Sequence, residues 1–146
     1  MHHVTLTVTD IERTCEWYRS VLGFQDIVRY RNDSITAECY VLAHPDATSP
    51  TIGLRQYDNN EDFAFDEHRV GLDHLAFDVG DTESLRQWQE QLERLGVACT
   101  VTHLPELSIL VMRDPDNTQI ELCTRIVEAR SSSVGPDGRI KLPSDR

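Results

Sequence analysis

Apolar and polar side chains alternate along residues 3–9. A period of two predicts a strand with one face against a core and the other face open. Residues 11–22 instead carry apolar side chains at helical spacing, with Asp10 before them as a candidate N-cap and Gly23 after them as a stop. Turn residues divide the following sequence into three expected strands, at 24–31, 34–43 and 50–58.

The same order of elements restarts 71 residues later, because 74 − 3, 79 − 8, 81 − 10, 83 − 12 and 88 − 17 all equal 71. His3, Val8, Asp10, Glu12 and Trp17 recur as His74, Val79, Asp81, Glu83 and Trp88. The second copy predicts a strand at 73–80, a helix that is capped by Asp81 and runs to about Leu95, and strands at 97–103, 107–113 and 118–125. An internal duplication of this kind predicts two structurally related modules.

We therefore expect an α+β fold of two tandem βαβββ modules, whose curved mixed sheets form an open, barrel-like metal cavity. The modules span residues 1–58 and 73–127, and an acidic connector, 59–72, joins them. Residues 128–146 are polar with scattered glycine and proline, which predicts a loosely ordered tail.

Composition narrows the function classes. The 146 residues carry a formal net charge of −11, which argues against a nucleic-acid partner. No apolar run approaches the roughly 20 residues that span a bilayer, and no secretory signal is recognised, so no membrane partner is expected. The four cysteines form no CxxC pair, which favours a reduced, cytoplasmic protein.

Strand alternation places three candidate metal ligands on open sheet faces. His3 opens the first expected strand and His74 opens its repeat, and both lie out of phase with the apolar residues of those strands. Glu121 is out of phase with Ile120 and Leu122 in the last strand. Two imidazoles and one carboxylate suit divalent iron, and also Mn, Ni or Zn.

The two copies, the helix ending WYRSVLGF and the terminal segment MRDPDNTQIEL resemble the vicinal oxygen chelate superfamily over about residues 2–126. That superfamily includes glyoxalase I, extradiol dioxygenases, fosfomycin-resistance enzymes and bleomycin-resistance proteins. The resemblance implies that His3, His74 and Glu121 hold a divalent metal ion and that the chain forms a homodimer. It also implies a small-molecule substrate.

Differences between this chain and individual members of the superfamily bear on which reaction it could catalyse. Glyoxalase I carries a second glutamate in the fourth strand of its first module, where this chain has Gly53, which predicts a vacancy and argues against glyoxalase I activity. Extradiol dioxygenases carry a motif that His103, Asp114-Pro115 and Glu121 match in part, with Val111 in place of its tyrosine and Asn117 in place of its glycine. His103 therefore joins Glu121 as a candidate catalytic residue, and a surface strand residue is the alternative. Fosfomycin enzymes share His-x-Thr in the first strand, which implies a binding role for Thr5, but their serine-rich potassium loop has no counterpart here.

Alternation in the strand at 50–58 directs Arg55 and Tyr57 to the same face as the metal candidates. Arg55 is suited to hold an anionic substrate group, although a solvated surface arginine is the alternative.

The sequence thus predicts a metal-dependent enzyme acting on a small substrate chelated through neighbouring oxygens. Lyase or isomerase chemistry and ring-cleaving dioxygenase chemistry are both open. The alternative from another class is a non-catalytic protein that sequesters a small molecule.

Overall fold

The computed structural model describes residues 2–46, 50–61 and 63–125. The expectation of a loosely ordered tail at 128–146 falls outside the described residues.

The first module is a four-stranded sheet with one helix. Its elements are β1 (His3–Thr7), α1 (Ile11–Leu22), β2 (Gln25–Asn32), β3 (Ala37–Ala43) and β4 (Thr51–Tyr57). The strand order is β1-β4-β3-β2, in which β1 and β4 run parallel and the other neighbours run antiparallel. The expected strand–helix–three-strand order is confirmed.

The second module repeats this plan. Its elements are β5 (His74–Asp78), α2 (Thr82–Leu95), β6 (Cys99–His103), β7 (Leu107–Arg113) and β8 (Gln119–Arg125). The strand order is β5-β8-β7-β6, with β5 parallel to β8. The duplication found in the sequence is therefore a duplication of topology.

The helix boundaries follow from local chemistry. The carboxylates of Asp10 and Asp81 accept hydrogen bonds from the backbone N–H groups of Arg13, at 3.0 Å, and Ser84, at 2.8 Å. Both helices end at a glycine in the left-handed region, with φ of 77° at Gly23 and 70° at Gly96. A side chain would strain these positions, so the two glycines fix where the chain leaves each helix.

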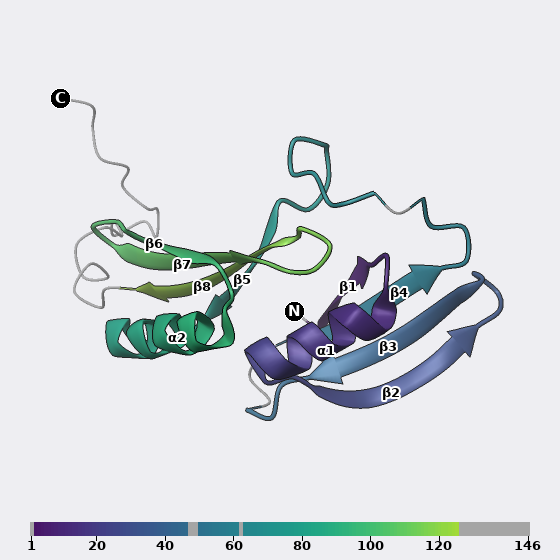
Figure 1. The fold of residues 1–146 in the computed structure, drawn as a ribbon, viewed down its shortest axis with the longest axis horizontal. Coiled ribbons are helices and arrows are strands. Elements are labelled where there is room, and N and C mark those ends of the chain that lie inside the picture. Colours follow the sequence, from purple (N-terminus) through teal and green to yellow (C-terminus); the bar gives the residue numbers. More distant parts are fainter. Residues whose placement is uncertain (1, 47–49, 62, 126–146) are drawn as a thin grey trace, which may run out of the picture.

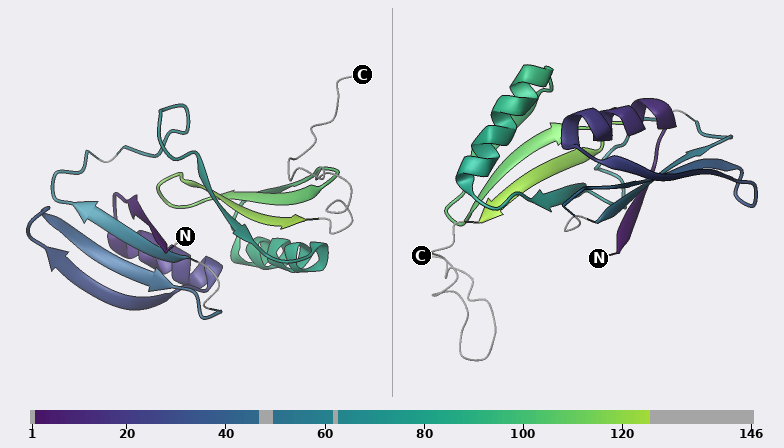
Figure 2. Two further views of the ribbon diagram at one scale, coloured as in Figure 1. Left: turned by 180° about the vertical axis from the view of Figure 1, so that it is seen from behind. Right: turned by 90° about the horizontal axis from the view of Figure 1, so that it is seen from below.

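Each helix packs on its own sheet, and the two modules lie side by side (Figure 1). Helix α1 contacts β3 and β4, whereas α2 contacts β6, β7 and β8. The sheets are curved but form two separate four-stranded sheets within the described chain (Figure 2). The face of each sheet opposite its helix stays open, and the candidate ligands were expected on these faces.

The turn between β7 and β8 joins the modules. Asp116, 5% exposed, accepts hydrogen bonds from residues at the start of the first module. The donors are the backbone N–H and hydroxyl of Thr9, the guanidinium of Arg13 at 3.1 Å and the hydroxyl of Thr14 at 2.9 Å. The Tyr18 hydroxyl also donates to Asp114 at 3.3 Å. These contacts fix the first module against the second.

No helix in the described ranges is long and apolar enough to cross a membrane.

Candidate metal and substrate site

The second module brings His74 and Glu121 together. In the register of β5 with β8, Ala76 lies opposite Glu121, and His74 lies two residues before Ala76 on the same open face. The intervening Leu75, Ile120 and Leu122 are buried in the core. The Nε2 atom of His74 lies 3.6 Å from Oε2 of Glu121.

Neighbouring polar groups orient both side chains. The Nδ1 atom of His74 lies 2.7 Å from a carboxylate oxygen of Asp73. A carboxylate only accepts, so Nδ1 carries the proton of this contact, and Nε2 is the ring nitrogen that faces Glu121. The Gln119 amide donates to Oε1 of Glu121 at 2.9 Å, which leaves Oε2 turned toward His74.

This pair fits a divalent cation. Metal–nitrogen and metal–oxygen bonds of about 2.0 to 2.2 Å place two ligand atoms of one ion about 2.8 to 3.6 Å apart, for angles from 90° to the tetrahedral value. The observed separation of 3.6 Å lies at the upper end of that range. The Cys123 thiol lies 3.8 Å from Oε2 of Glu121 on the same face, and no role was expected for it.

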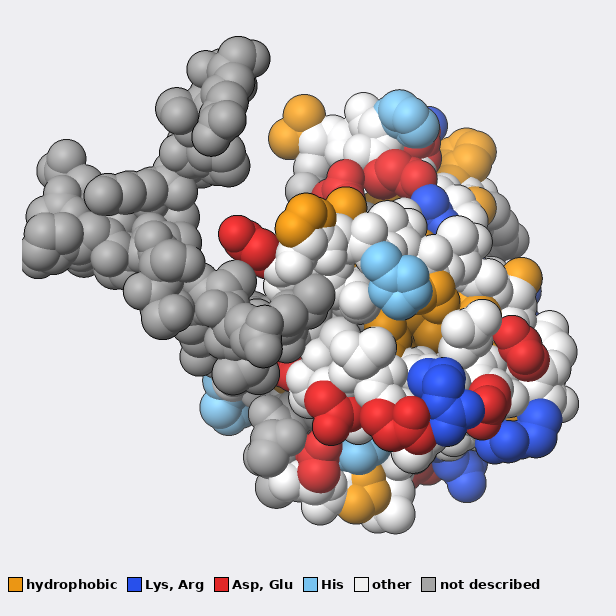
Figure 3. Space-filling view, turned by 90° about the vertical axis from the view of Figure 1, so that its left-hand side faces the viewer, with side chains coloured by type: hydrophobic (Ala, Val, Ile, Leu, Met, Phe, Trp, Pro, Cys, Tyr) orange, Lys and Arg blue, Asp and Glu red, His pale blue; other side chains and the backbone are white. Residues whose placement is uncertain are grey.

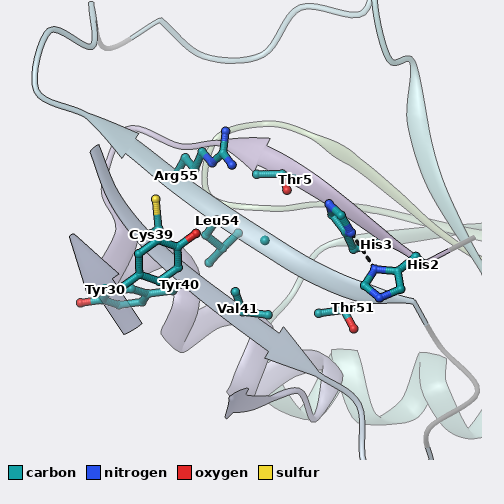
Figure 4. A pocket seen from close by; sticks show the side chains of 11 residues that line it. His2, His3, Thr5, Tyr30, Cys39, Tyr40, Val41, Thr51, Leu54 and Arg55 are labelled. Carbon is teal, nitrogen blue, oxygen red and sulfur yellow. Dashed lines mark hydrogen bonds between the residues drawn. The ribbon is translucent and has the colours of Figure 1, made fainter. Parts of the chain in front are cut away.

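His3 lies in a second place, at the edge of the first sheet. It lines a cavity of about 250 Å³ on the open face of β1, β3 and β4, called here the β1–β4 cavity. The lining residues are His2, His3, Thr5, Tyr30, Cys39, Tyr40, Val41, Thr51, Gly53, Leu54 and Arg55. Figure 4 shows the rings of His2 and His3 at one end of this cavity, Arg55 at the other, and Thr5 between them.

Two of the three expected substrate-binding residues line this cavity. Thr5 and Arg55 face it, whereas Tyr57 lies beyond its lining. Tyr57 is instead a neighbour of Arg55, and its phenol is the first of the influences that raise the pKa of the Arg55 guanidinium.

The space at Gly53 is filled, which corrects the expected vacancy. A β-carbon at this position would lie 2.6 Å from Oγ1 and 3.1 Å from Cγ2 of Thr5, the neighbour of Gly53 across the parallel pair. Real side chains do not approach so closely. Gly53 is therefore required by Thr5, and the fourth ligand of glyoxalase I has no room here.

His103 lies on the other side of the second sheet. Its position in β6 puts it on the same face of the strand as Cys99 and Val101, and it borders a pocket formed with α2 residues. Its Nδ1 atom lies 3.0 Å from the Ser108 hydroxyl. The structure does not bring His103 to Glu121, so a shared catalytic role gains no support from the geometry.

The three expected ligands fall into two parts within one chain. His74 and Glu121 are neighbours, but His3 belongs to the β1–β4 cavity, and these two parts line separate pockets. Among residues 2–46, 50–61 and 63–125, no group of three histidine, cysteine or acidic side chains is arranged to hold a metal ion.

Sequence reasoning missed two residues that contact the candidate ligands. His2 lies beside His3, with their Nδ1 atoms 2.8 Å apart, and Asp73 stands beside His74 in the same way. The repeat offset would have found this relationship, because 73 − 2 is also 71. In both modules the residue before the candidate ligand engages Nδ1 of its ring.

Duplicated βαβββ modules, with histidine and glutamate on the open sheet faces, define the class of this protein. The family model described as the Glyoxalase/Bleomycin resistance protein/Dioxygenase superfamily matches residues 1–122, and the chain belongs to that superfamily.

Solved structures support the assignment. A glyoxylase/bleomycin resistance protein/dioxygenase domain from Frankia sp. EAN1pec is 35% identical, with a TM-score of 0.77, over 86% of this chain and 90% of the other. A mutant of the fosfomycin resistance protein FosX from Listeria monocytogenes, in complex with Mn(II) and 1S,2S-dihydroxypropylphosphonic acid, shares the fold at 18% identity. Its TM-score is 0.64, over 89% of this chain and 95% of FosX.

Proposed function

We propose that this protein is a divalent-metal-dependent enzyme acting on a small substrate that binds through neighbouring oxygens. The reaction is of the lyase or isomerase type or of the ring-cleaving dioxygenase type. The observation that carries the proposal is the 3.6 Å separation of His74 Nε2 and Glu121 Oε2 on an open sheet face. The Mn(II) in the FosX complex agrees with such a site in the superfamily.

His3, His74 and Glu121 would hold the metal ion, which is Fe, Mn, Ni or Zn by the chemistry of these donors. A bound ion acts as a Lewis acid toward substrate oxygens and stabilises negative charge that develops on them. Asp73 keeps the proton of His74 on Nδ1, and Gln119 holds one oxygen of Glu121. Thr5 and Arg55 line the neighbouring cavity and would contact the substrate.

The two parts of the site are proposed to meet between two copies of the chain. In this homodimer, His3 of one subunit would complete the pair formed by His74 and Glu121 of the other. The proposal is supported by the position of β1 and β5, each at one edge of its sheet. It also agrees with the absence of a three-ligand group among the described residues of a single chain.

Mixed dimers test both the ligands and their sharing. His3→Ala and His74→Ala chains, differently tagged, are co-expressed, and the doubly tagged species is purified and its metal content measured. Shared sites leave one intact site per mixed dimer, so about half of the wild-type metal content is expected. Sites within one chain leave both sites damaged, and metal content near that of either single variant would contradict the shared arrangement.

If neither single variant loses metal as a homodimer, the proposed ligand set is wrong. The alternative of a sequestering protein without turnover is favoured by no specific observation. A cytoplasmic location is part of the proposal, because Cys15, Cys39 and Cys99 are free thiols, as expected in a reducing compartment.

A further inference from the structure

The β1–β4 cavity carries positive charge in an otherwise acidic protein. The chain has 25 aspartates and glutamates against 14 lysines and arginines, yet no carboxylate of the described residues lines this cavity. Arg55 lines it, together with the neutral side chains of Tyr30, Cys39 and Val41.

Seven other arginines of the described chain form ion pairs with neighbouring carboxylates. Figure 3 shows basic side chains lying directly beside acidic ones on one face of the molecule. The pairs are Arg13–Asp116, Arg19–Glu16, Arg29–Asp26, Arg31–Asp58, Arg69–Asp66, Arg86–Glu83 and Arg113–Glu67. Among the arginines whose side chains the structure describes, from Arg13 to Arg113, Arg55 and Arg94 have no ion-pair partner, and of these two Arg55 lines a pocket.

The groups around Arg55 agree with its lack of an ion-pair partner. The groups that raise its pKa are Tyr57, Cys39 and Tyr30, none of which is a carboxyl group. The side chain is half-buried, so its charge is partly withdrawn from water without a counter-ion. An anion that enters the cavity would meet a half-buried guanidinium that is paired with no carboxylate of the described residues.

The positive charge of Arg55 lies at a distance from His3, the proposed metal ligand in this cavity. In the parallel register, His3 lies opposite Thr51 and Thr7 lies opposite Arg55, so the two residues are four positions apart along the sheet. At about 3.3 Å per residue, this is about 13 Å between their backbones. Val41 and Gly53 lie opposite each other between these ends and line the cavity, together with Thr5 and Leu54.

We infer that the substrate carries an anionic group remote from its chelated oxygens, joined to them by an apolar body, and that Arg55 binds this anion. The inference rests on the proposed function for the role of the chelated end. Carboxylates and phosphonates both match the planar donor fork of arginine. Contacts to a remote group of this kind help to hold the reacting end in place.

Binding of probe molecules to full-length protein stripped of metal tests the anion site by itself. The probes are 4-phenylbutanoate, the neutral 4-phenylbutanamide and 3-phenylpropylphosphonate, each measured by isothermal titration calorimetry. At least one anion should bind more tightly than the amide, and the comparison of carboxylate with phosphonate identifies the preferred anion.

Substitutions assign the binding to Arg55. In Arg55→Gln, the affinity for the preferred anion should fall roughly ten- to a hundredfold, as expected for the loss of a charge-assisted hydrogen bond. Arg55→Lys should retain part of it. Arg94→Gln, which removes the other arginine without an ion pair, is the matched control and should bind like wild type, and melting temperatures verify that each variant folds.

Equal affinity for the amide and the anions, no binding of either anion, or full anion affinity in Arg55→Gln would each overturn the inference. Failure of the metal proposal gives a different result. If wild type binds no metal but its anion affinity still falls in Arg55→Gln, the anion site exists and the metal site does not. If both proposals hold, Arg55→Gln lowers anion affinity and leaves metal affinity unchanged.

Discussion

Asp73 Oδ1 lies 2.7 Å from Nδ1 of His74 and thereby turns Nε2 of the same ring toward Glu121. Carboxylates that hold a ligating histidine in this way fix its tautomer and raise its basicity, and their loss costs about ten- to a hundredfold in metal affinity. We therefore predict that Asp73→Ala raises the Kd for Mn(II) by about that factor. Nitrogen NMR shifts of the His74 ring would also show a change of tautomer.

The chain contains a matched control for this change. His68 and Asp66 form a similar pair in the connector, with Nδ1 3.1 Å from the carboxylate, and His68 is not a candidate ligand. Asp66→Ala should leave Mn(II) affinity unchanged. Equal losses in both variants would show a general effect of net charge and would rule out positioning by Asp73.

The close approach of Gly53 to Thr5 predicts strong coupling between these positions. Gly53→Ala forces its new β-carbon against Thr5, so the free energy of unfolding should fall by about 1–3 kcal/mol, as for other overpacked sites. In a Thr5→Ala background, the same substitution should cost less. Urea denaturation of the four proteins gives the coupling energy, and strictly additive effects would show that the two residues do not meet.

The same contact predicts the absence of glyoxalase I activity. The position of its second glutamate is occupied by Gly53, and Thr5 leaves no room for a side chain. Turnover of methylglyoxal with glutathione should be undetectable above the metal-free control in a coupled absorbance assay. Robust turnover would mean that another carboxylate supplies the missing base.

The contacts of Asp116 predict a large effect on stability. Its removal leaves the hydroxyl of the fully buried Thr14 and the backbone N–H of Thr9 without their acceptor. Asp116→Ala should therefore lower the free energy of unfolding by about 2–4 kcal/mol. Asp58→Ala, which removes an exposed bridge to Arg31, should cost at most about 1 kcal/mol in the same denaturation experiment.

Local patterns predicted the modules because each pattern has a local cause. Asp10 and Asp81 cap helices through bonds to residues three positions away, and Gly23 and Gly96 end them by their backbone conformation. Strand alternation likewise placed His74 and Glu121 on one open face. Their register across the parallel pair then brought them together.

The other features of the site depend on contacts between strands that are far apart in the sequence, and these limited what the sequence could predict. The space at Gly53 depends on Thr5 in another strand, which no local pattern reveals. The orientation of His103 follows from its phase with Cys99 and Val101, which opposes the role that the family motif implied. The meeting of His3 with His74 depends on assembly, and one chain does not determine it.

Titration of Mn(II) into the metal-free, full-length protein tests the central claim most directly, with wild type and Glu121→Gln compared by isothermal titration calorimetry. Glutamine keeps the size of the side chain and removes its charge. The account predicts one ion per chain for wild type and a large loss of affinity for Glu121→Gln, with both proteins folded and of equal oligomeric state. Equal affinity in the two proteins, or no binding by wild type, would contradict it.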